Sequence, residues 1–405
     1  MKIAQINTTY GITDSTGRNV KELHNYFERN GYESRVYVTR INNETEKNDP
    51  GIVFFSNAFD GKIHALLSRM TGLQGYFSYF ATIKLIKSLK EYAPDVILLN
   101  VLHSNCINFN LFYEYVSKLE VPIIFVLHDC FFFTGHCCHY IDVQCEKWKN
   151  ECGGCPSMKK WNKSLFFDTS RKSLADKKKW YDRIRIKGVI AVSHWLEEEA
   201  KQSILHEAQI TTIYNWVDQN VFKPNINISS EWNKFYGKKI ALAVASFWGE
   251  DKGLQEIQQL AVECQNLEII MVGGNIKEAE NIKNIHAIGT VHSAEKLAEL
   301  YSMADVFLNP SKMETFGKTT AEALSCGTPV VAYRTTACME LVDNTRGALA
   351  RLGDVDDYIE KAKYVLEKGK TYYSEASVKF AQENFNSMVN MQQYVDVINS
   401  LIKEK

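Results

Sequence analysis

The stretch VFLNPSKMETFGKTTAEALSCGTPVVAY, residues 306–333, contains two short apolar runs on either side of a helix-like segment. The runs Val306–Asn309 and Pro329–Tyr333 are rich in β-branched and aromatic residues, which favour β-strands. The segment between them starts near Gly317 and ends at Gly327, and glycine is common where helices begin and end. The stretch therefore predicts a strand, a helix and a second strand of one parallel sheet.

The same alternation of short strands and amphipathic helices continues in both directions along the chain. A helix is expected over residues 18–30, because Val20, Leu23 and Phe27 share one face and Gly31 can stop it. Further strands are expected at Lys2 to Asn7, Glu33 to Thr39, Asp95 to Val101, Pro122 to His128, Gly188 to Ser193, Lys239 to Ser246, Leu267 to Gly273 and Ile285 to Gly289. The pattern predicts an α/β protein.

The chain has 405 residues, which is too long for one ordinary core and predicts two domains. The polar, irregular stretch FKPNINISSEWNKFYGKK, residues 222–239, is expected to be the interdomain linker. The predicted parts are residues 1–222, residues 223–385 and a C-terminal helix over residues 386–405 that packs back on the first domain.

Composition limits the classes of partner. With 47 basic and 48 acidic residues the net charge is −1, so wholesale electrostatic binding of nucleic acid is excluded. No apolar run approaches the roughly 20 residues that span a bilayer, and the opening MKIAQINTTYG lacks the pattern of a signal peptide. We therefore expect a cytoplasmic protein.

The two glutamates near Gly317 predict a ligand site. The backbone N–H groups of Phe316, Gly317 and Lys318 at a helix start form an anion site that suits phosphate. Glu314 precedes that turn and Glu322 follows it by more than one helical turn, so the carboxylates can accept hydrogen bonds from hydroxyls on both sides of a phosphate ester. A nucleoside diphosphate sugar has such hydroxyls. The alternative is a solvated glutamate pair on a surface helix.

This region resembles the C-terminal lobe of retaining GT-B glycosyltransferases of family 4, the group-1 glycosyl transferases. The motifs that carry the resemblance are ADVFLNPS, the two glutamates eight residues apart, EAL, GTPVV, IYNWVDQNVFKP, AVSHWL and IGTV. The resemblance implies two Rossmann-like lobes with parallel sheets facing across a cleft. It also implies transfer of a hexosyl unit, with retention, from a UDP- or GDP-sugar to a glycan or lipid-linked glycan in capsule or exopolysaccharide biosynthesis.

The resemblance also implies roles for residues of the second half. Glu314 would contact the donor sugar, Glu322 the ribose, and the backbone of Phe316, Gly317 and Lys318 the phosphates.

In the family a lysine neutralises the leaving diphosphate, and Lys252 of ASFWGEDKG, residues 245–253, matches it. Ser246 and Val291 are also assigned to the donor site. Phe247 stands where the family has an arginine, so either another residue supplies that cation or one cation suffices. No catalytic metal is expected.

Two features of the first half are assigned to the same chemistry. His128 ends the apolar run VPIIFVLHD, at the sheet edge where open α/β sheets bind ligands, and the resemblance implies contact with the donor. A buried structural histidine is the alternative. Gly17, in the loop NTTYGITDSTGR after the first strand, could bring backbone N–H groups close to the diphosphate or the acceptor.

Six cysteines lie within residues 130–155, and the insertion spans about residues 130–160. The candidate ligands of a structural zinc are four of Cys137, Cys138, Cys145, Cys152 and Cys155, and His136 or His139 could replace one. A disulfide or redox pair and unligated thiols are the alternatives. A similar insertion after His-Asp occurs in a bacterial polysaccharide-assembly subgroup of the family, so we expect it to shape the acceptor side.

A basic and aromatic stripe follows at residues 170–187, where SRKSLADKKKWYDRIRIK carries eight Lys or Arg with Trp180 and Tyr181 and is preceded by Trp161, Phe166 and Phe167. This composition suits an anionic membrane face, on the inner side of the plasma membrane, or a polyprenyl-diphosphate-linked acceptor. A solvated helix is the alternative, and nucleic acid is not favoured.

Other functions remain open. The two-lobed fold also serves nucleotide-sugar epimerases and phosphorylases, and the Cys cluster on a scaffold without activity would make a zinc-bearing interaction module.

Overall fold

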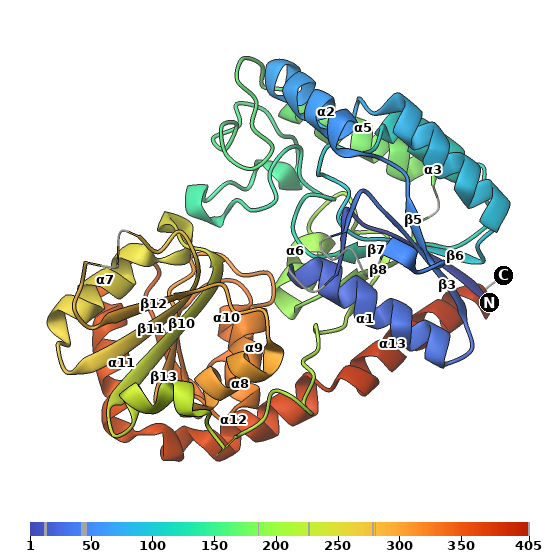
Figure 1. Cartoon of the computed structure of the whole chain (residues 1–405). Helices are drawn as coiled ribbons and strands as arrows, with labels where there is room; N and C mark the ends of the chain where they lie inside the picture. The colour runs from blue at the N-terminus through green and yellow to red at the C-terminus, as the bar shows by residue number, and fades with distance from the viewer. Residues whose placement is uncertain are drawn as a thin grey trace. The chain divides into compact units, whose positions relative to one another are not determined.

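The computed structural model describes residues 1–11, 14–41, 47–184, 186–225, 227–277, 279 and 281–403. The chain divides into two compact units, the first made of Met1–Ile213 and Met391–Lys405 and the second of Tyr214–Asn390 (Figure 1). Each unit is built on a wholly parallel sheet, so the predicted α/β fold is confirmed.

The first unit has a seven-stranded sheet in the order β5-β3-β1-β6-β7-β8-β9, and a separate pair β2-β4. The strands are β1 (Lys2–Ile6), β2 (Thr9–Tyr10), β3 (Glu33–Val38), β4 (Arg40–Ile41), β5 (Ile52–Phe54), β6 (Val96–Leu99), β7 (Ile123–Leu127), β8 (Ile186–Ala191) and β9 (Gln209–Thr212). The central strands β6 and β7 are fully buried, as expected of a parallel sheet covered on both faces.

Helices cover both faces of this sheet. They are α1 (Ser15–Arg29), α2 (Ala58–Thr71), α3 (Tyr79–Tyr92), α4 (Phe109–Val116), α5 (Ser170–Arg183) and α6 (His194–Lys201), together with α13 (Ser387–Lys403), whose residues from Met391 onward belong to this unit. Figure 1 shows α3 and α5 on one side of the strands and α1 and α13 on the other. Tyr26 of α1 donates a hydrogen bond to Gln392 of α13 (2.6 Å), which holds the C-terminal helix on this unit.

Helix α1 forms as its sequence pattern predicts. Val20, Leu23 and Phe27 are buried, and the helix begins after Asp14, whose side chain accepts a hydrogen bond from the backbone N–H of Gly17. Gly31 follows the helix with a φ of 80°, a conformation that glycine adopts without strain.

The second unit has a six-stranded sheet in the order β12-β11-β10-β13-β14-β15. The strands are β10 (Lys239–Phe247), β11 (Leu267–Gly274), β12 (Ile285–Gly289), β13 (Val306–Asn309), β14 (Val330–Tyr333) and β15 (Gly347–Ala350). The helices are α7 (Leu254–Glu263), α8 (Ala294–Met303), α9 (Lys318–Ser325), α10 (Cys338–Leu341), α11 (Val355–Lys368) and α12 (Lys370–Asn384). Helices α7 and α11 pack together, and α8 and α9 pack together on the other face of the sheet (Figure 1).

The division between the units differs from the sequence boundary. The units meet between Ile213 and Tyr214, whereas the sequence placed the boundary at residue 222. The stretch 222–239 is not a free linker: it lies inside the second unit, where residues Ser230–Phe235 form a 3₁₀ turn that buries Trp232 and Phe235. The large aromatic side chains of Trp232 and Phe235 attach this stretch to the second unit, although its overall polar composition indicated a linker.

Candidate functional site

The loop between β13 and α9 forms the start of the site in the second unit. Gly317 caps α9 with a φ of 90°, in the left-handed region that glycine tolerates, and its position provides no side-chain cap. The helix starts at Lys318, as predicted from the sequence. The N–H groups of a first helical turn have no acceptor within the helix, and the helix dipole adds positive potential there. This arrangement is suited to binding an anion.

A lysine and a glutamate meet beside this helix start. Lys252 Nζ lies 2.6 Å from Glu314 Oε1 and 3.3 Å from Ser311 Oγ. Burial by itself lowers the pKa of Lys252, but attraction to Glu314 and the hydrogen bond with it outweigh burial, and the pKa of Lys252 is raised. Lys252 is therefore a cation at neutral pH, and its side chain is 40% exposed and accessible to a ligand.

Backbone contacts hold the two loops that carry this pair. The N–H of Glu314 donates to Thr336 Oγ1 (3.0 Å), and the N–H of Ala337 donates to the Glu314 carbonyl (3.2 Å). The N–H of Lys312 donates to the carbonyl of Asp251 (3.1 Å), which ties the loop of Glu314 to the turn that precedes α7. The Lys252–Glu314 pair is therefore fixed by the main chain on both sides.

Glu322 is almost fully buried, with 4% of its surface exposed. Its Oε2 accepts a hydrogen bond from the hydroxyl of Tyr301 (3.2 Å). Burying a carboxylate is unfavourable unless it is hydrogen-bonded. The hydrogen bond from Tyr301 therefore stabilises the buried carboxylate of Glu322. Glu322 lies four residues after Lys318 and shares its face of α9.

The other residues assigned to the donor lie at the same edge of this sheet. Ser246 stands near the carboxyl end of β10 and is exposed, and Val291 follows β12 and is partly buried. The carboxyl ends of parallel strands meet at one edge, which is where open α/β sheets bind ligands. The side chain of Phe316 packs between the rings of Tyr214 and Phe385, so only its backbone is available to a ligand.

In the first unit, His128 and Gly17 lie in different environments. His128 follows β7, and its Nε2 lies 2.9 Å from Asn100 Oδ1. The N–H of Gly17 donates to Asp14 Oδ1 (2.7 Å), so that donor is already engaged in capping α1. Residues 12 and 13 of the same loop lie outside the described residues.

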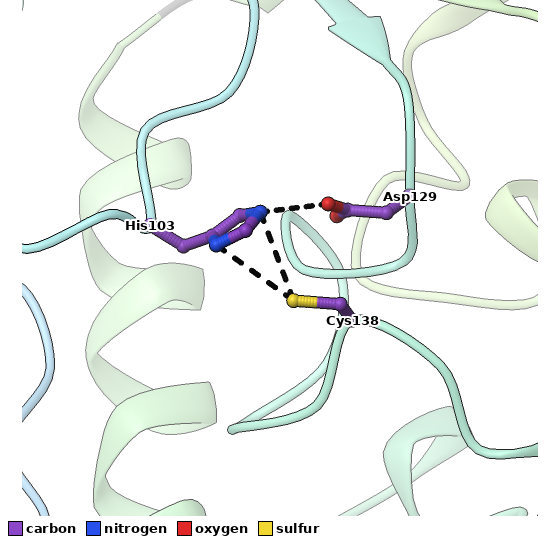
Figure 2. Close-up of side chains that lie close together, drawn as sticks. All are labelled: His103, Asp129 and Cys138. Atoms are coloured by element: carbon purple, nitrogen blue, oxygen red, sulfur yellow. Dashed lines mark hydrogen bonds and ion pairs between the residues drawn. The ribbon is translucent and has the colours of Figure 1, made fainter. Parts of the chain in front are cut away.

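A cluster that the sequence did not predict follows β6 and β7 in the first unit (Figure 2). His103 Nε2 lies 2.7 Å from Asp129 Oδ2, and the Cys138 sulfur lies 3.7 and 3.8 Å from the two ring nitrogens of His103. Burial by itself lowers the pKa of His103, but the charges of Cys138 and Asp129 outweigh it and raise the pKa. Burial opposes ionisation of Asp129, but His103 holds the pKa of Asp129 at about 2. Among the described residues, these three form the group whose ligand atoms all lie within 4.8 Å of one another.

His103 also lines a pocket of about 480 Å³ in the first unit. This volume is in the range of small-molecule sites. The charged side chains that line the pocket are Arg40 and Lys62, so its electrostatic character is positive. The remaining lining residues are Thr39, Ser56, Asn57, Ala58, Gly61, Ala65, Ser104, Asn105, Cys106 and Asn162. Polar residues after several strands were the only sequence signal for this pocket.

The predicted zinc ligands are separated by the structure into two places. A small cavity of about 10 Å³ is lined by Cys137, Cys145, Cys152 and Cys155, and Cys137 and Cys155 are hydrogen-bonded to each other. Cys138 lies with His103 instead. All ten cysteines fall within the described residues and are free thiols.

The basic stripe at residues 170–187 is not an exposed aromatic surface. Trp180 and Tyr181 of α5 are buried, and Trp180 stacks on Tyr113, because these aromatic residues complete the core beside the sheet. Lys177 is also buried and donates hydrogen bonds to the carbonyls of Phe131 and Thr134. The expected aromatic membrane face at this helix is therefore wrong, although its other described basic residues are largely exposed. Arg185 lies outside the described residues.

Comparison with known proteins identifies the family of the chain. Residues 16–221 match Glycosyltransferase Family 4, and residues 238–368 match Glycosyl transferases group 1. The first match alone covers half of the chain.

Related sequences have specific activities in their names. N-acetyl-alpha-D-glucosaminyl L-malate synthase of Bacillus anthracis is 24% identical over 230 residues, which cover 53% of this chain and 60% of the relative. N,N'-diacetylbacillosaminyl-diphospho-undecaprenol alpha-1,3-N-acetylgalactosaminyltransferase of Campylobacter jejuni is 25% identical over 194 residues, which cover 46% of this chain and 49% of the relative. The chain thus spans about half to three fifths of the length of these two relatives.

Solved structures share the fold. Anabaena Alr3699/HepE in complex with UDP has a TM-score of 0.70 at 18% identity and covers 99% of this chain and 100% of its own. Sucrose-phosphate synthase from Thermosynechococcus elongatus has a TM-score of 0.74 at 16% identity with full coverage of both chains. The chain therefore belongs to the glycosyltransferases of family 4, the group-1 glycosyl transferases, and has their GT-B fold of two Rossmann-like units.

Proposed function

We propose that this protein is a retaining glycosyltransferase that moves a hexosyl unit from a UDP- or GDP-sugar to a glycan or lipid-linked glycan during surface polysaccharide biosynthesis. The observation that carries the proposal is the 2.6 Å pair of Lys252 and Glu314 beside the glycine-capped start of α9. A cation and the N–H groups of a helix start suit a diphosphate, while the neighbouring carboxylate suits sugar hydroxyls. The UDP complexes of Anabaena Alr3699/HepE support a nucleotide donor in this fold.

The proposed roles follow from this geometry. The diphosphate of the donor binds at the backbone of Gly317 and Lys318, and Lys252 stabilises the negative charge that develops when the glycosidic bond breaks. Glu314 accepts hydrogen bonds from the donor sugar, and Glu322 from the ribose.

In the proposed reaction the leaving phosphate takes the proton of the acceptor hydroxyl on the same face of the sugar, which gives retention. Lys252 and the N–H groups at the start of α9 stabilise the negative charge of the leaving diphosphate, so the proposed chemistry requires no divalent ion. Ser246 and Val291 complete the proposed donor site, and His128 of the first unit is a further proposed catalytic residue.

The pocket of the first unit supports an anionic acceptor. Arg40, Lys62 and the charged His103 can bind a phosphate or diphosphate, and Asp129 holds His103 in place. The Campylobacter jejuni relative is named for a diphospho-undecaprenol acceptor, which supports a lipid-linked glycan here.

We also propose that the Cys-rich insertion holds a structural zinc. Cys137, Cys145, Cys152 and Cys155 line one cavity, and four thiolates are a donor set that zinc prefers. Such an ion would fix the insertion and take no part in the reaction. The free thiols throughout the chain support a reducing, cytoplasmic location.

Product analysis tests the proposed reaction. The protein is incubated with UDP- and GDP-sugars and polyprenyl-diphosphate-linked glycan, and we expect free nucleoside diphosphate together with an acceptor enlarged by one hexose. An altered nucleotide sugar without acceptor dependence would identify an epimerase, and a sugar phosphate formed with inorganic phosphate would identify a phosphorylase. Absence of any turnover together with absence of nucleotide binding would favour a zinc-bearing scaffold.

A further inference from the structure

Exposed apolar side chains are concentrated on one part of the first unit. Among the described residues 21 large apolar or aromatic side chains are exposed; twelve lie in α2, α3 and residues 158–169, and the other nine lie in the second unit. The twelve are Phe59, Ile63, Leu66, Leu67, Met70, Tyr79, Phe80, Ile83, Trp161, Leu165, Phe166 and Phe167. Scattered exposed apolar residues are ordinary, whereas a gathered set marks an interaction site.

The three segments are joined to one another. The N–H of Leu165 donates to the carbonyl of Arg69 in α2 (2.8 Å). Ser78, which precedes α3, donates to Asp60 Oδ2 of α2 (2.6 Å). Figure 1 shows α2 and α3 on the same outer side of the first unit. The exposed side chains therefore belong to one continuous region of the surface.

Helix α2 has its polar and apolar faces reversed relative to an ordinary surface helix. Its two buried residues are His64 and Ser68, while Leu66 and Phe59 are 61% and 73% exposed. His64 Nδ1 lies 2.8 Å from Ser78 Oγ, and burial lowers the pKa of His64 to about 4, so the ring is neutral and integrated into the unit. An apolar face directed outward is what a helix at a membrane interface requires.

Charge around the region indicates which partner fits. Residues 58–71, 79–85 and 158–169 contain six Lys or Arg against two acidic residues. Asp60 and Asp168 accept hydrogen bonds from groups of the first unit itself. Basic and aromatic side chains together suit an anionic bilayer. A symmetric pairing of two copies would place the basic residues of both copies against each other, which is unfavourable.

We propose that α2, the first half of α3 and residues 158–169 form a membrane-docking surface for anionic lipid. The aromatic and aliphatic side chains enter the headgroup boundary, and the lysines contact lipid phosphates. The proposed surface attaches the protein to one leaflet. No helix within the described residues is long and apolar enough to cross the bilayer.

The adjacent positions Ala58, Gly61, Lys62 and Ala65 of α2 line the pocket of the first unit. Docking would therefore bring that pocket to the bilayer. If the proposed function holds, the diphosphate of a lipid-linked acceptor enters the pocket while its chain stays in the membrane. Vesicle binding itself does not depend on the transfer reaction.

Co-sedimentation of the full chain with vesicles tests the proposal. Wild-type protein is mixed with phosphatidylcholine vesicles and with vesicles of equal parts phosphatidylcholine and phosphatidylglycerol, at low and high salt. We expect binding to the anionic vesicles that weakens with salt. The double variants F59S/L66S and F166S/F167S should each lower the partition coefficient by about tenfold or more.

The matched control is Y236S/Y372S, which removes two aromatic residues of the second unit that are 92% and 60% exposed, and it should bind like wild type. Failure of wild type to bind anionic vesicles, or equal binding by the surface variants and the control, overturns the proposal. A wild-type dimer in light scattering that F166S/F167S dissociates, without vesicle binding, would assign the surface to a second copy. Transfer to a water-soluble acceptor should be unchanged in these variants, which separates this proposal from the proposed function.

Discussion

Lys252 and Glu314 form an ion pair beside the start of α9. The lysine is too exposed for the pair to add much to stability, because solvent screens such pairs. Lys252 lies beside the start of α9, where a bound diphosphate would add negative charge. A cation that is already held in position can stabilise that charge. The residue is thus expected to matter to the reaction more than to the fold.

Replacing Lys252 by Met should lower the rate of sugar transfer by about 100- to 1,000-fold, as for loss of one preorganised charge-stabilising group. The melting temperature should change little. Steady-state kinetics at saturating donor measures the effect. Lys361→Met is a matched control, since Lys361 is also 40% exposed and pairs with an acidic residue on α11. Equal rates in the two variants would exclude Lys252 from charge stabilisation.

Single residues differed in how far sequence could predict their surroundings. The spacing of Glu314 and Glu322 around Gly317 predicted a helix start between them, because those residues are neighbours in the chain. The contacts of His103 with Asp129 and Cys138 span 26 and 35 residues, and only folding brings them together. Trp180 and Tyr181 were expected on an exposed surface, but both side chains are buried in the core of the first unit.

At the level of elements, the turn before α7 positions Lys252. Gly253 has a φ of 74°, and a Cβ there would lie 2.5 Å from Pro310 Cβ and 2.6 Å from the Pro310 carbonyl oxygen. The loop of Glu314 thus packs directly against this glycine. Only glycine can adopt this φ without strain and also leave room for Pro310.

Gly253→Ala should destabilise the protein by about 1–2 kcal/mol for the left-handed backbone, with about 2 kcal/mol more for the clash. Gly237→Ala separates the two effects, because Gly237 has a φ of 75° and a Cβ there would have nothing within 4 Å, so it should show the backbone effect alone. Urea unfolding measures both. An equal loss of unfolding free energy in both variants would show that the contact with Pro310 relaxes without destabilising the protein.

The Cys-rich insertion should contain zinc in the purified protein. Cys152→Ser should remove the metal and lower the melting temperature, because a structural ion stabilises the fold it binds. Cys106→Ser, at a buried cysteine that does not line the cavity, should keep the metal. Elemental analysis of the purified proteins gives the answer, and wild type without zinc would refute the site.

Elements were predictable where their pattern was unambiguous. The central strands are continuous apolar runs buried on both faces, and each was placed within a few residues. The edge strand β9 and the small-residue strand β15, GALA, have no such run and were missed. The three-residue edge strand β5 was also missed, although its sequence IVF is apolar. Helix α2 could not be assigned a membrane face, since its apolar residues have the same appearance in sequence whether they face the core or solvent.

For the whole molecule, the family and the order of both units were predictable because the motifs occur in both halves. The boundary was not, because the Val217 N–H donates to the Phe385 carbonyl and Phe222 packs on Tyr301, which attaches residues 214–222 to the second unit, and because α13 returns to the first. The pocket and the proposed membrane-docking surface arise from segments that the sequence separates widely. Both lie in the first unit, while the proposed donor site lies in the second.

The central claim is that the second unit binds a nucleotide sugar through α9. Thermal unfolding of the whole chain in the presence of UDP, GDP and ADP, and their sugars, tests it most directly, because a ligand that binds only the folded state raises its stability. We predict that UDP or GDP and its sugar raise the melting temperature of wild type and that Glu322→Gln, which keeps the shape of the side chain, abolishes the increase. No increase with any nucleotide, or the same increase in Glu322→Gln, would contradict the account.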